Sequence, residues 1–337
     1  MYVQRDYSLR HHNTFGFDVR AHHFVQANDV ATLREALRLR AAHDWPLLIL
    51  GGGSNLVIRD TIPGLTLQPN LHHVDFHDEG DQVLVTAGCG VVWDELVQAC
   101  VKRQLWGIEN LSLIPGTVGA APVQNIGAYG VELADCLQDV QYLDIDSGEL
   151  HTLTREQGRY GYRDSLFKHA LAGKAIITQV RLRLSKKPSP VLHYQALRDA
   201  LPVDAAPDDI ALIRETVINV RQSKLPDPAV TGNAGSFFKN PTISALDYSA
   251  LSAQHPGIPG HEQADGRIKT AAAWLVDRAG WKGYRQDGVG VHDRQAIVLV
   301  NTGGGSGEKI CRLAARIQAD VQDKFGIALE IEPQIVP

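Results

Sequence analysis

The stretch 114–132 restricts the fold of this 337-residue sequence more than any other part of it. It reads IPGTVGAAPVQNIGAYGVE, with four glycines, two prolines and a single charged residue at its end. Glycine and proline in this number interrupt helices and strands, so the chain must form a long loop here. Long uncharged loops within a domain usually have a function, and a wall with few side chains suits a flat aromatic ligand held by backbone groups. A buried connection without a ligand is the alternative.

A second glycine-rich run, Gly51–Asn55, follows the apolar segment Pro46–Leu50. Glycines let the backbone approach a phosphate closely, and the serine and asparagine that end the run add side-chain donors. The run is not a Walker loop, because no Gly-Lys-Ser/Thr follows, and it lacks the third glycine of the dinucleotide fingerprint, where Leu56 stands. A plain turn between strands is the alternative. A third run, 303–307, is interpreted as a loop in which Ser306 begins a helix.

Hydrophobic spacing along the chain predicts a mixture of helices and strands. Helices are expected over 30–42, 93–104, 208–224, 269–278 and 307–324, and strands over 46–50, 82–87, 140–145, 175–184, 295–300 and 327–335. The elements do not alternate as regular βαβ units, which indicates the α+β class. A charged and proline-rich linker, 185–190, and the length of the chain predict about two domains with a boundary near 190–205.

Composition excludes several classes of protein. The chain has 33 Lys and Arg against 38 Asp and Glu, so neither nucleic acid nor an anionic membrane is an expected partner. The first residues have no apolar signal-peptide region, and no apolar run is long enough for a membrane span, which predicts a cytoplasmic protein. The four cysteines are scattered without metal-ligand or disulfide spacing, so no metal site is expected.

Two basic clusters are candidate ligand sites. The segment 160–168, YGYRDSLFK, surrounds Arg163 with aromatic and hydroxyl groups, and arginine is a natural clamp for a carboxylate. A surface turn with an Arg–Asp pair is the alternative. Arg221 and Lys224 lie at the end of a predicted helix, where they either bind the terminal carbonyl groups or meet a diphosphate.

A candidate proton donor lies in 232–241, which reads GNAGSFFKNP. Ser236 is flanked there by glycine and two phenylalanines, so its hydroxyl would lie in a dry pocket. The segment is not a nucleophile elbow, because Phe238 replaces the final glycine of that motif. Glu330 and Glu332 are two residues apart on a predicted strand and therefore share a face; either is a candidate acid, or both form a solvated edge.

With these segments in order along nearly the whole chain, the sequence resembles the UDP-N-acetylenolpyruvoylglucosamine reductases. The resemblance is carried by NTFG at 13–16, LGGGSN at 50–55, 107–132, 161–168, LPDP at 225–228, 232–241, QADG at 263–266, VH at 291–292 and 329–332. It implies an FAD-binding domain of the vanillyl-alcohol-oxidase-like type, with two α/β subdomains over 1–68 and 69–200. An α+β substrate-binding domain over 201–337 would follow.

The resemblance also implies roles for particular residues. It assigns FAD binding to Gly51, Gly52, Gly53, Ser54, Asn55, Gly116, Thr117, Gly119, Ala120, Asn125, Gly127, Ala128, Gly130 and Tyr162. It assigns substrate binding to Tyr194, Arg221, Lys224, Asn240 and Gln295. Arg163, Ser236 and Glu332 would be catalytic: Ser236 as the proton donor and the other two stabilising negative charge. The family usually ends in Leu-Glu-Pro-Glu, whereas this chain has LEIEP at 329–333, so Glu330 stays open as the alternative acid.

The implied activity is the NADPH-dependent reduction of UDP-N-acetylglucosamine enolpyruvate to UDP-N-acetylmuramate through FAD, a step of peptidoglycan precursor synthesis. Both substrates are small molecules, and a monomeric cytoplasmic enzyme is expected. An FAD-dependent alcohol or aldehyde oxidase of the same flavin fold is the alternative, against which stand the segment 232–241 and the cations Arg221 and Lys224.

Overall fold

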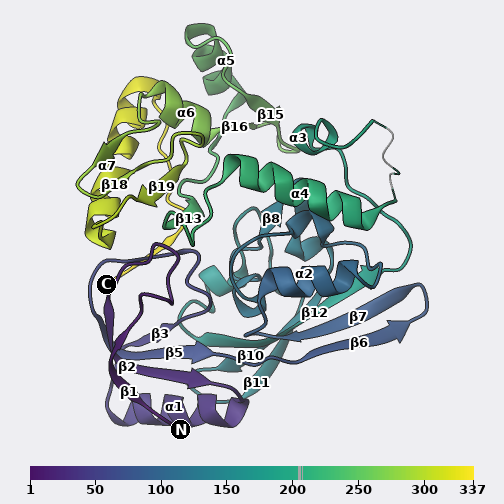
Figure 1. Ribbon diagram of the computed structural model, residues 1–337, viewed down its shortest axis with the longest axis vertical. Coiled ribbons are helices and arrows are strands. Elements are labelled where there is room, and N and C mark those ends of the chain that lie inside the picture. The colour runs from purple at the N-terminus through teal and green to yellow at the C-terminus, as the bar shows by residue number, and fades with distance from the viewer. Residues whose placement is uncertain (204–205, 207) are drawn as a thin grey trace. The chain divides into compact units, whose positions relative to one another are not determined.

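The computed structural model describes residues 1–203, 206 and 208–337 (Figure 1). The chain divides into two compact units. Unit 1 comprises 1–8, 20–53 and 62–223, and unit 2 comprises 9–19, 54–61 and 224–337. The three-part division after residues 68 and 200 stays a prediction, and part of the predicted boundary region 190–205 lies outside the described residues.

Unit 1 begins with a four-stranded sheet in the order β1-β2-β5-β3. Its strands are β1 (Gln4–Ser8), β2 (Arg20–Ala27), β3 (Leu47–Ile49) and β5 (Ile62–Pro69). Strand β5 is parallel to β2 and β3, as expected where a helix, α1 (Val30–Ala42), connects two strands. Asp29 caps α1 by accepting a hydrogen bond from Thr32 N at 2.7 Å. The helix buries Leu33 and Leu37 against the sheet.

The second sheet of unit 1 is antiparallel throughout, in the order β11-β10-β12-β7-β6. Its strands are β6 (Val74–Glu79), β7 (Gln82–Gly88), β10 (Leu137–Asp144), β11 (Leu150–Thr154) and β12 (Ala175–Ser185). Helices α2 (Trp93–Val101) and α4 (Ile210–Lys224) share one hydrophobic core with this sheet. The predicted helix 93–104 is three residues too long, because turns follow Val101 and Gln104 is left-handed at φ +56°.

The glycine-rich stretch of unit 1 is a loop, as predicted, interrupted by short elements only. These are η1 (Glu109–Leu111), η2 (Val118–Ala120), the two-residue strands β8 (Gly127–Ala128) and β9 (Val131–Glu132), and η3 (Leu133–Asp135). Two further short elements of the unit are η4 (Leu166–Lys168) and α3 (Gln195–Arg198). We call 110–130 the flavin loop, for the cofactor role that the sequence assigns to it.

Unit 2 contains an antiparallel sheet in the order β13-β19-β18-β17, a small sheet in the order β14-β16-β15, and a parallel pair of β4 and β20. The strands are β4 (Leu56–Ile58), β13 (Asn233–Ser236), β14 (Thr242–Ile243), β15 (Gly260–Glu262), β16 (Ile268–Thr270), β17 (Arg285–Gln286), β18 (Val289–Val291), β19 (Val298–Asn301) and β20 (Gln334–Val336). The helices are α5 (Ala245–Gln254), α6 (Ala272–Arg278) and α7 (Gly307–Phe325). Ser306 caps α7 as predicted, and the helix packs its buried stripe on β18, β19 and β4.

Three predicted elements of unit 2 differ from the structure. Residues 269–270 belong to β16, and α6 starts only where Asn240 Oδ1 accepts a hydrogen bond from Ala272 N. Strand β19 begins at Val298, after a turn closed by its hydrogen bond to Gln295 O. The predicted strand 327–335 is wrong over most of its length, because its residues divide between two partners. Ile331 bridges Phe238, whereas β20 pairs with β4.

Candidate functional site

The two glycine runs of unit 1 contact each other backbone to backbone. A Cβ atom on Gly52 would lie 3.0 Å from Gly116 Cα, and one on Gly51 would lie 3.1 Å from Thr117 Oγ1. A Cβ atom on Gly119 would overlap the Cβ of Cys89 at 2.5 Å. A side chain would therefore overlap its neighbour at Gly119 and crowd the facing run at Gly51 and Gly52, and the surface that these positions form consists of peptide groups. Such a wall fits a cofactor with a diphosphate and a flat ring, and FAD has both.

Ser54 and Asn55 continue the first run along the sequence, but they belong to unit 2. The carbonyl oxygen of Asn55 accepts a hydrogen bond from Gln334 N at 2.9 Å, next to the pairing of β4 with β20. The GGGSN run is therefore fixed within unit 1 at its glycines and within unit 2 at its polar end.

Asn125 is a clamp inside the flavin loop. Its side-chain amide donates to Glu132 Oε2 at 2.7 Å and to Gly161 O at 3.0 Å, and its oxygen accepts from Ala134 N at 3.0 Å. The residue is fully buried and left-handed at φ +47°. Both amide hydrogens are thus used within the protein. Asn125 therefore shapes the loop from within, and its side chain is not left for a cofactor.

Arg163 lies beside the same loop with a left-handed backbone at φ +54°. Its guanidinium donates to Gly127 O at 2.8 Å and lies 5.3 Å from the ring centre of Tyr162, which is 39% exposed. Lys168 Nζ holds the carbonyl oxygen of Arg163 at 3.0 Å. Left-handed residues other than glycine are uncommon and tend to occur at functional sites. Unit 1 therefore joins the predicted catalytic arginine to the loop that is predicted to bind the flavin.

The end of the flavin loop carries Tyr129, again left-handed at φ +50°. The ring of Tyr194 packs edge-on against it, with 5.3 Å between the ring centres. Asn110 Nδ2 bonds both Tyr129 O and Val191 O, so it ties the segment that carries Tyr194 to the loop. Tyr194 is 47% exposed, which leaves its ring accessible to a ligand.

Arg221 lies near Tyr129 on α4 and is largely buried. Burial lowers the pKa of its guanidinium. Tyr129 and Asp94 act in the opposite direction and raise the pKa, whereas the like charge of Arg163 lowers it further. Among the described residues its Nε atom has no hydrogen-bond partner. These two arginines are close enough to oppose each other's charge, and one of them has an unused donor. Together they form a candidate binding site for an anionic group.

In unit 2, Ser236 ends strand β13 and is exposed, so the dry pocket that the sequence predicts for its hydroxyl is not formed within this unit. Gly235 before it is left-handed at φ +72°, and Phe237 and Phe238 after it are buried. The segment 330–332 runs beside these residues: Glu332 N donates to Phe237 O and Lys239 N donates to Glu330 O, both at 2.9 Å. Unit 2 thus brings the predicted proton donor and the C-terminal glutamates into one neighbourhood.

The remaining predicted substrate residues in unit 2 occupy varied positions. Lys224 is exposed at the end of α4, and Asn240 uses its side-chain oxygen at the start of α6. Gln295 is partly exposed, and its carbonyl oxygen accepts the turn hydrogen bond that precedes β19.

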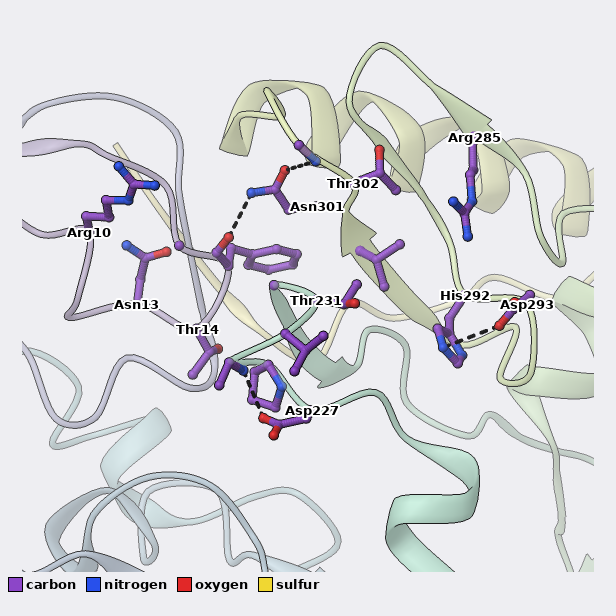
Figure 2. Close-up of a pocket in the computed structure, with 18 of the residues that line it drawn as sticks. Arg10, Asn13, Thr14, Asp227, Thr231, Arg285, His292, Asp293, Asn301 and Thr302 are labelled. Carbon is purple, nitrogen blue, oxygen red and sulfur yellow. Dashed lines mark hydrogen bonds and ion pairs between the residues drawn. The ribbon is translucent and has the colours of Figure 1, made fainter.

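Unit 2 also contains a wide hollow of about 1120 Å³, with Arg10, Arg285 and His292 in its wall (Figure 2). His292 Nε2 lies 3.4 Å from Asp293, and Asn301 bonds Phe15 O at 2.9 Å. The predicted residues Lys224, Ser236, Asn240, Gln295 and Glu332 do not belong to the described residues that line it. The hollow is therefore separate from the predicted substrate residues of this unit.

Sequence reasoning missed a group of polar residues behind the flavin loop. Arg214 of α4 binds the carboxylate of Asp94 on α2, and both contact the loop at Ser112 and Leu113. Asp94 and Arg214 are 120 residues apart, so no local pattern announces the pair. The only local signal is that Arg214 is a charged residue among the apolar positions of the helical pattern of α4.

The residues that the structure describes contain neither a candidate membrane-spanning helix nor a candidate metal-binding group. No helix in the described part of the chain is long and apolar enough to cross a bilayer. Within the same residues, His, Cys, Asp and Glu side chains form no group of three or more that could hold a metal ion.

The comparisons with known proteins first define a class. Residues 21–154 match the model of an FAD binding domain, and residues 227–336 match the C-terminal domain of UDP-N-acetylenolpyruvoylglucosamine reductase. The chain is thus a flavoprotein with an FAD-binding part and a reductase C-terminal part.

The full-length relatives narrow this class to one family. The reductase of Pseudomonas syringae pv. tomato is 46% identical over 99% of each chain, and that of Chromobacterium violaceum is 47% identical over 98% of each. The crystal structure of the enzyme from Thermus caldophilus superposes with a TM-score of 0.71 at 25% identity, covering 100% of both chains. The protein belongs to the UDP-N-acetylenolpyruvoylglucosamine reductase family. The predicted family, the α+β fold with an FAD-binding part, and the FAD cofactor are confirmed.

Proposed function

We propose that the protein reduces UDP-N-acetylglucosamine enolpyruvate to UDP-N-acetylmuramate with NADPH as hydride donor, in the synthesis of peptidoglycan precursors. The observation that carries the proposal is the 46% identity to a named reductase over 99% of the chain. The exposed Ser236 beside 330–332 in unit 2 supports it independently, since this reduction needs a proton donor.

The residues that would hold FAD are those of the two glycine runs. The diphosphate would be faced by the peptide groups of Gly51, Gly52, Gly53, Gly116, Thr117, Gly119 and Ala120, together with Ser54 and Asn55. The ring would be lined by Gly127, Ala128, Gly130, Asn125 and Tyr162. Bound there, FAD would supply the hydride chemistry that links NADPH to the enolpyruvyl group. The protein supplies the binding wall and the surrounding charges.

The catalytic side chains act on the enolpyruvyl ether. Its CH₂=C(OR)–COO⁻ group gains a hydride at the methylene carbon and a proton at the α carbon, which yields CH₃–CH(OR)–COO⁻. We propose that Arg163, with its positive charge, stabilises the negative charge that builds up on the carboxylate and the α carbon. Glu332, as the acid or through hydrogen bonding, contributes to the same task, and Ser236 donates the proton to the α carbon.

Two contacts support Glu332 over Glu330 as the acid. Glu332 is held by its backbone to Phe237, the residue after Ser236. Glu330 is 69% exposed, and its carboxylate forms an ion pair with Lys239 Nζ. The Glu330 carboxylate is therefore already engaged by a lysine, whereas Glu332 lies beside the strand that carries Ser236.

The remaining polar residues would bind the UDP-sugar. Tyr194 would cover the uridine diphosphate group by ring contact, and Arg221 and Lys224 would offer positive charge to the phosphates. Asn240 and Gln295 would add hydrogen bonds. We further propose that the enzyme is a cytoplasmic monomer, with three domains at 1–68, 69–200 and 201–337.

The visible spectrum of the purified protein tests the proposal. We expect flavin absorbance that NADPH bleaches and that the enolpyruvyl UDP-sugar restores under anaerobic conditions. Flavin that oxygen reoxidises quickly, and that the sugar does not restore, would instead identify an oxidase of the same cofactor class. The absence of flavin after saturation with FAD would contradict both activities.

A further inference from the structure

Helix α4 presents two arginines to the flavin loop of unit 1. Arg214 and Arg221 are seven residues apart, which is close to two helical turns, so they share one face of the helix. Arg214 lies near the entry of the loop at Ser112, and Arg221 lies near Tyr129 at its end. A single helix therefore holds positive charge behind both ends of the loop.

The contact at the entry of the loop is the stronger of the two. Arg214 forms a two-pronged bond with Asp94 of α2, with N–O distances of 2.8 and 2.7 Å, and donates to Ser112 Oγ at 2.9 Å. The Asp94 carboxylate also accepts a hydrogen bond from Leu113 N at 2.5 Å. The Arg214 side chain is only 10% exposed and that of Asp94 is 27% exposed, so the pair is largely shielded from water.

Leu113 needs this support, because its backbone is left-handed at φ +58°. That conformation costs a residue with a Cβ free energy, and it persists only where the surroundings hold it. The next residues are Ile114, Pro115 and Gly116, and Gly116 is the one that packs against Gly52. The direction in which the chain leaves Leu113 thus decides where the glycine wall begins.

Asp94 balances more than one positive charge. Burial opposes ionisation of its carboxyl and by itself would raise the pKa. The hydrogen bonds from Arg214 and Leu113 and the charges of Arg214 and Arg221 outweigh burial, so the pKa of Asp94 lies below its usual value. The same carboxylate acts on Arg221 as an opposing charge. A buried ion pair adds little net stability compared with apolar residues of the same size. We therefore expect the Asp94–Arg214 pair to act mainly through the geometry that it imposes on the loop.

We propose that Asp94 and Arg214 are positioning residues for FAD: they fix Ser112 and Leu113 so that the flavin loop is shaped before the cofactor binds. The inference rests on the proposed function only for the identity of the ligand. It predicts that breaking the pair loosens the loop in the cofactor-free protein and weakens FAD binding, whatever the sugar substrate is.

The structure offers a matched control in the same unit. Arg181 forms a two-pronged pair with Asp139, at 2.7 and 2.5 Å, between strands β12 and β10. Asp139 is buried and Arg181 is partly exposed, and neither residue contacts the flavin loop in the described hydrogen bonds. The comparison of Arg214→Met with Arg181→Met therefore separates positioning of the loop from general loss of stability.

Two measurements that do not need turnover test the proposal. Flavin fluorescence gives the Kd of FAD, and hydrogen exchange of the cofactor-free protein reports on the amides of 112–113. In Arg214→Met we expect an FAD Kd raised roughly ten- to a hundred-fold and faster exchange at 112–113. Asp94→Asn and Arg214→Lys should lie between this variant and the unmodified protein, because each keeps one hydrogen bond to the pair or loop. Arg181→Met should change neither readout.

An unchanged FAD Kd and unchanged exchange in Arg214→Met would overturn the proposal, as would an equal loss of FAD binding in Arg181→Met. If Arg214→Met does not fold, Arg214→Lys and Asp94→Asn decide the question by the same two readouts. A failure of the proposed function looks different: the unmodified protein and Arg181→Met would bind FAD normally, yet the enolpyruvyl sugar would not reoxidise the reduced flavin.

Discussion

The flavin loop of unit 1 and the segment 232–241 of unit 2 are built in opposite ways. The loop is irregular, with left-handed Leu113, Asn125 and Tyr129, and it offers peptide groups where glycines exclude side chains. The segment 232–241 is anchored by the antiparallel pairing of β13 with β19, with a shift in register between Asn233 and Ser236, and offers one exposed hydroxyl, Ser236, at the end of a strand. One region is a surface made of backbone, and the other is a scaffold that presents a side chain.

This difference predicts different responses to substitution. A backbone surface is disrupted by added atoms, because a new Cβ displaces the opposing loop. The expected result is a loss of affinity for the cofactor. A presented side chain is damaged by removed atoms, and the damage appears as the rate of one chemical step. The predictions below use this contrast, beginning with the largest expected effect.

Removal of the Ser236 hydroxyl should have the largest effect. Ser236→Ala should bind FAD normally and be bleached by NADPH at close to the normal rate, since no proton from this residue is needed there. Reoxidation by the enolpyruvyl sugar should slow by roughly 10²–10⁴-fold, the range for a lost general acid. Stopped-flow traces of the two half-reactions measure both rates. Ser236→Cys should recover part of the loss. Equal slowing of both half-reactions would mean that Ser236 shapes the flavin pocket instead.

The two C-terminal glutamates give the second test. Glu332→Gln should slow reoxidation by the sugar by roughly 10²–10³-fold, because a stabiliser of developing charge is lost. Glu330→Gln, the matched control, removes an ion pair with Lys239 in which the glutamate is 69% exposed, and it should change the rate less than about threefold. The same stopped-flow assay compares them. A larger loss in Glu330→Gln would transfer the role to that residue.

The same contrast explains which features of each region can be predicted from the sequence. Glycine and proline signal a loop locally, and a serine between glycine and phenylalanines stands out, so both regions could be located from the sequence. The left-handed Leu113 and Arg163 could not, because their conformations depend on distant partners such as Asp94 and Gly127. Chain order alone does not reveal such contacts.

The elements that were wrongly bounded have the same cause. Residues 269–270 continue a helical pattern, but β14 and β15 hold them as the central strand of a sheet. The apolar alternation of 327–335 predicts one strand, yet residues 330–332 pair with 237–239 and β20 pairs with β4. Which partner a short apolar segment meets is a tertiary property, and it overrides local propensity.

Addition of one methyl group to the backbone wall should have an intermediate effect. A Cβ on Gly52 would lie 3.0 Å from Gly116 Cα, so Gly52→Ala must push the two runs apart. Overpacking of this kind costs about 1–3 kcal/mol, which corresponds to a loss of FAD affinity of roughly ten- to a hundred-fold if only the bound shape is strained. Gly161→Ala is the control, since its Cβ would meet nothing closer than 3.9 Å and its backbone is not left-handed. Equal FAD Kd values for the two variants, by flavin fluorescence, would contradict a backbone wall.

The smallest effect is expected at Tyr194, where unit 1 offers a side chain in place of backbone. Its ring packs edge-on against Tyr129 and is 47% exposed, so a ligand can cover the remaining face. One aromatic contact is worth about 1 kcal/mol, so Tyr194→Ala should raise the KM for the UDP-sugar by roughly tenfold or less and leave NADPH reduction of FAD unchanged. Tyr194→Phe keeps the ring and should retain the normal KM. Steady-state kinetics with each substrate varied in turn measure the split. An unaltered KM in Tyr194→Ala would make the residue a purely structural neighbour of Tyr129, and a parallel loss of NADPH reduction would place its effect on the flavin loop.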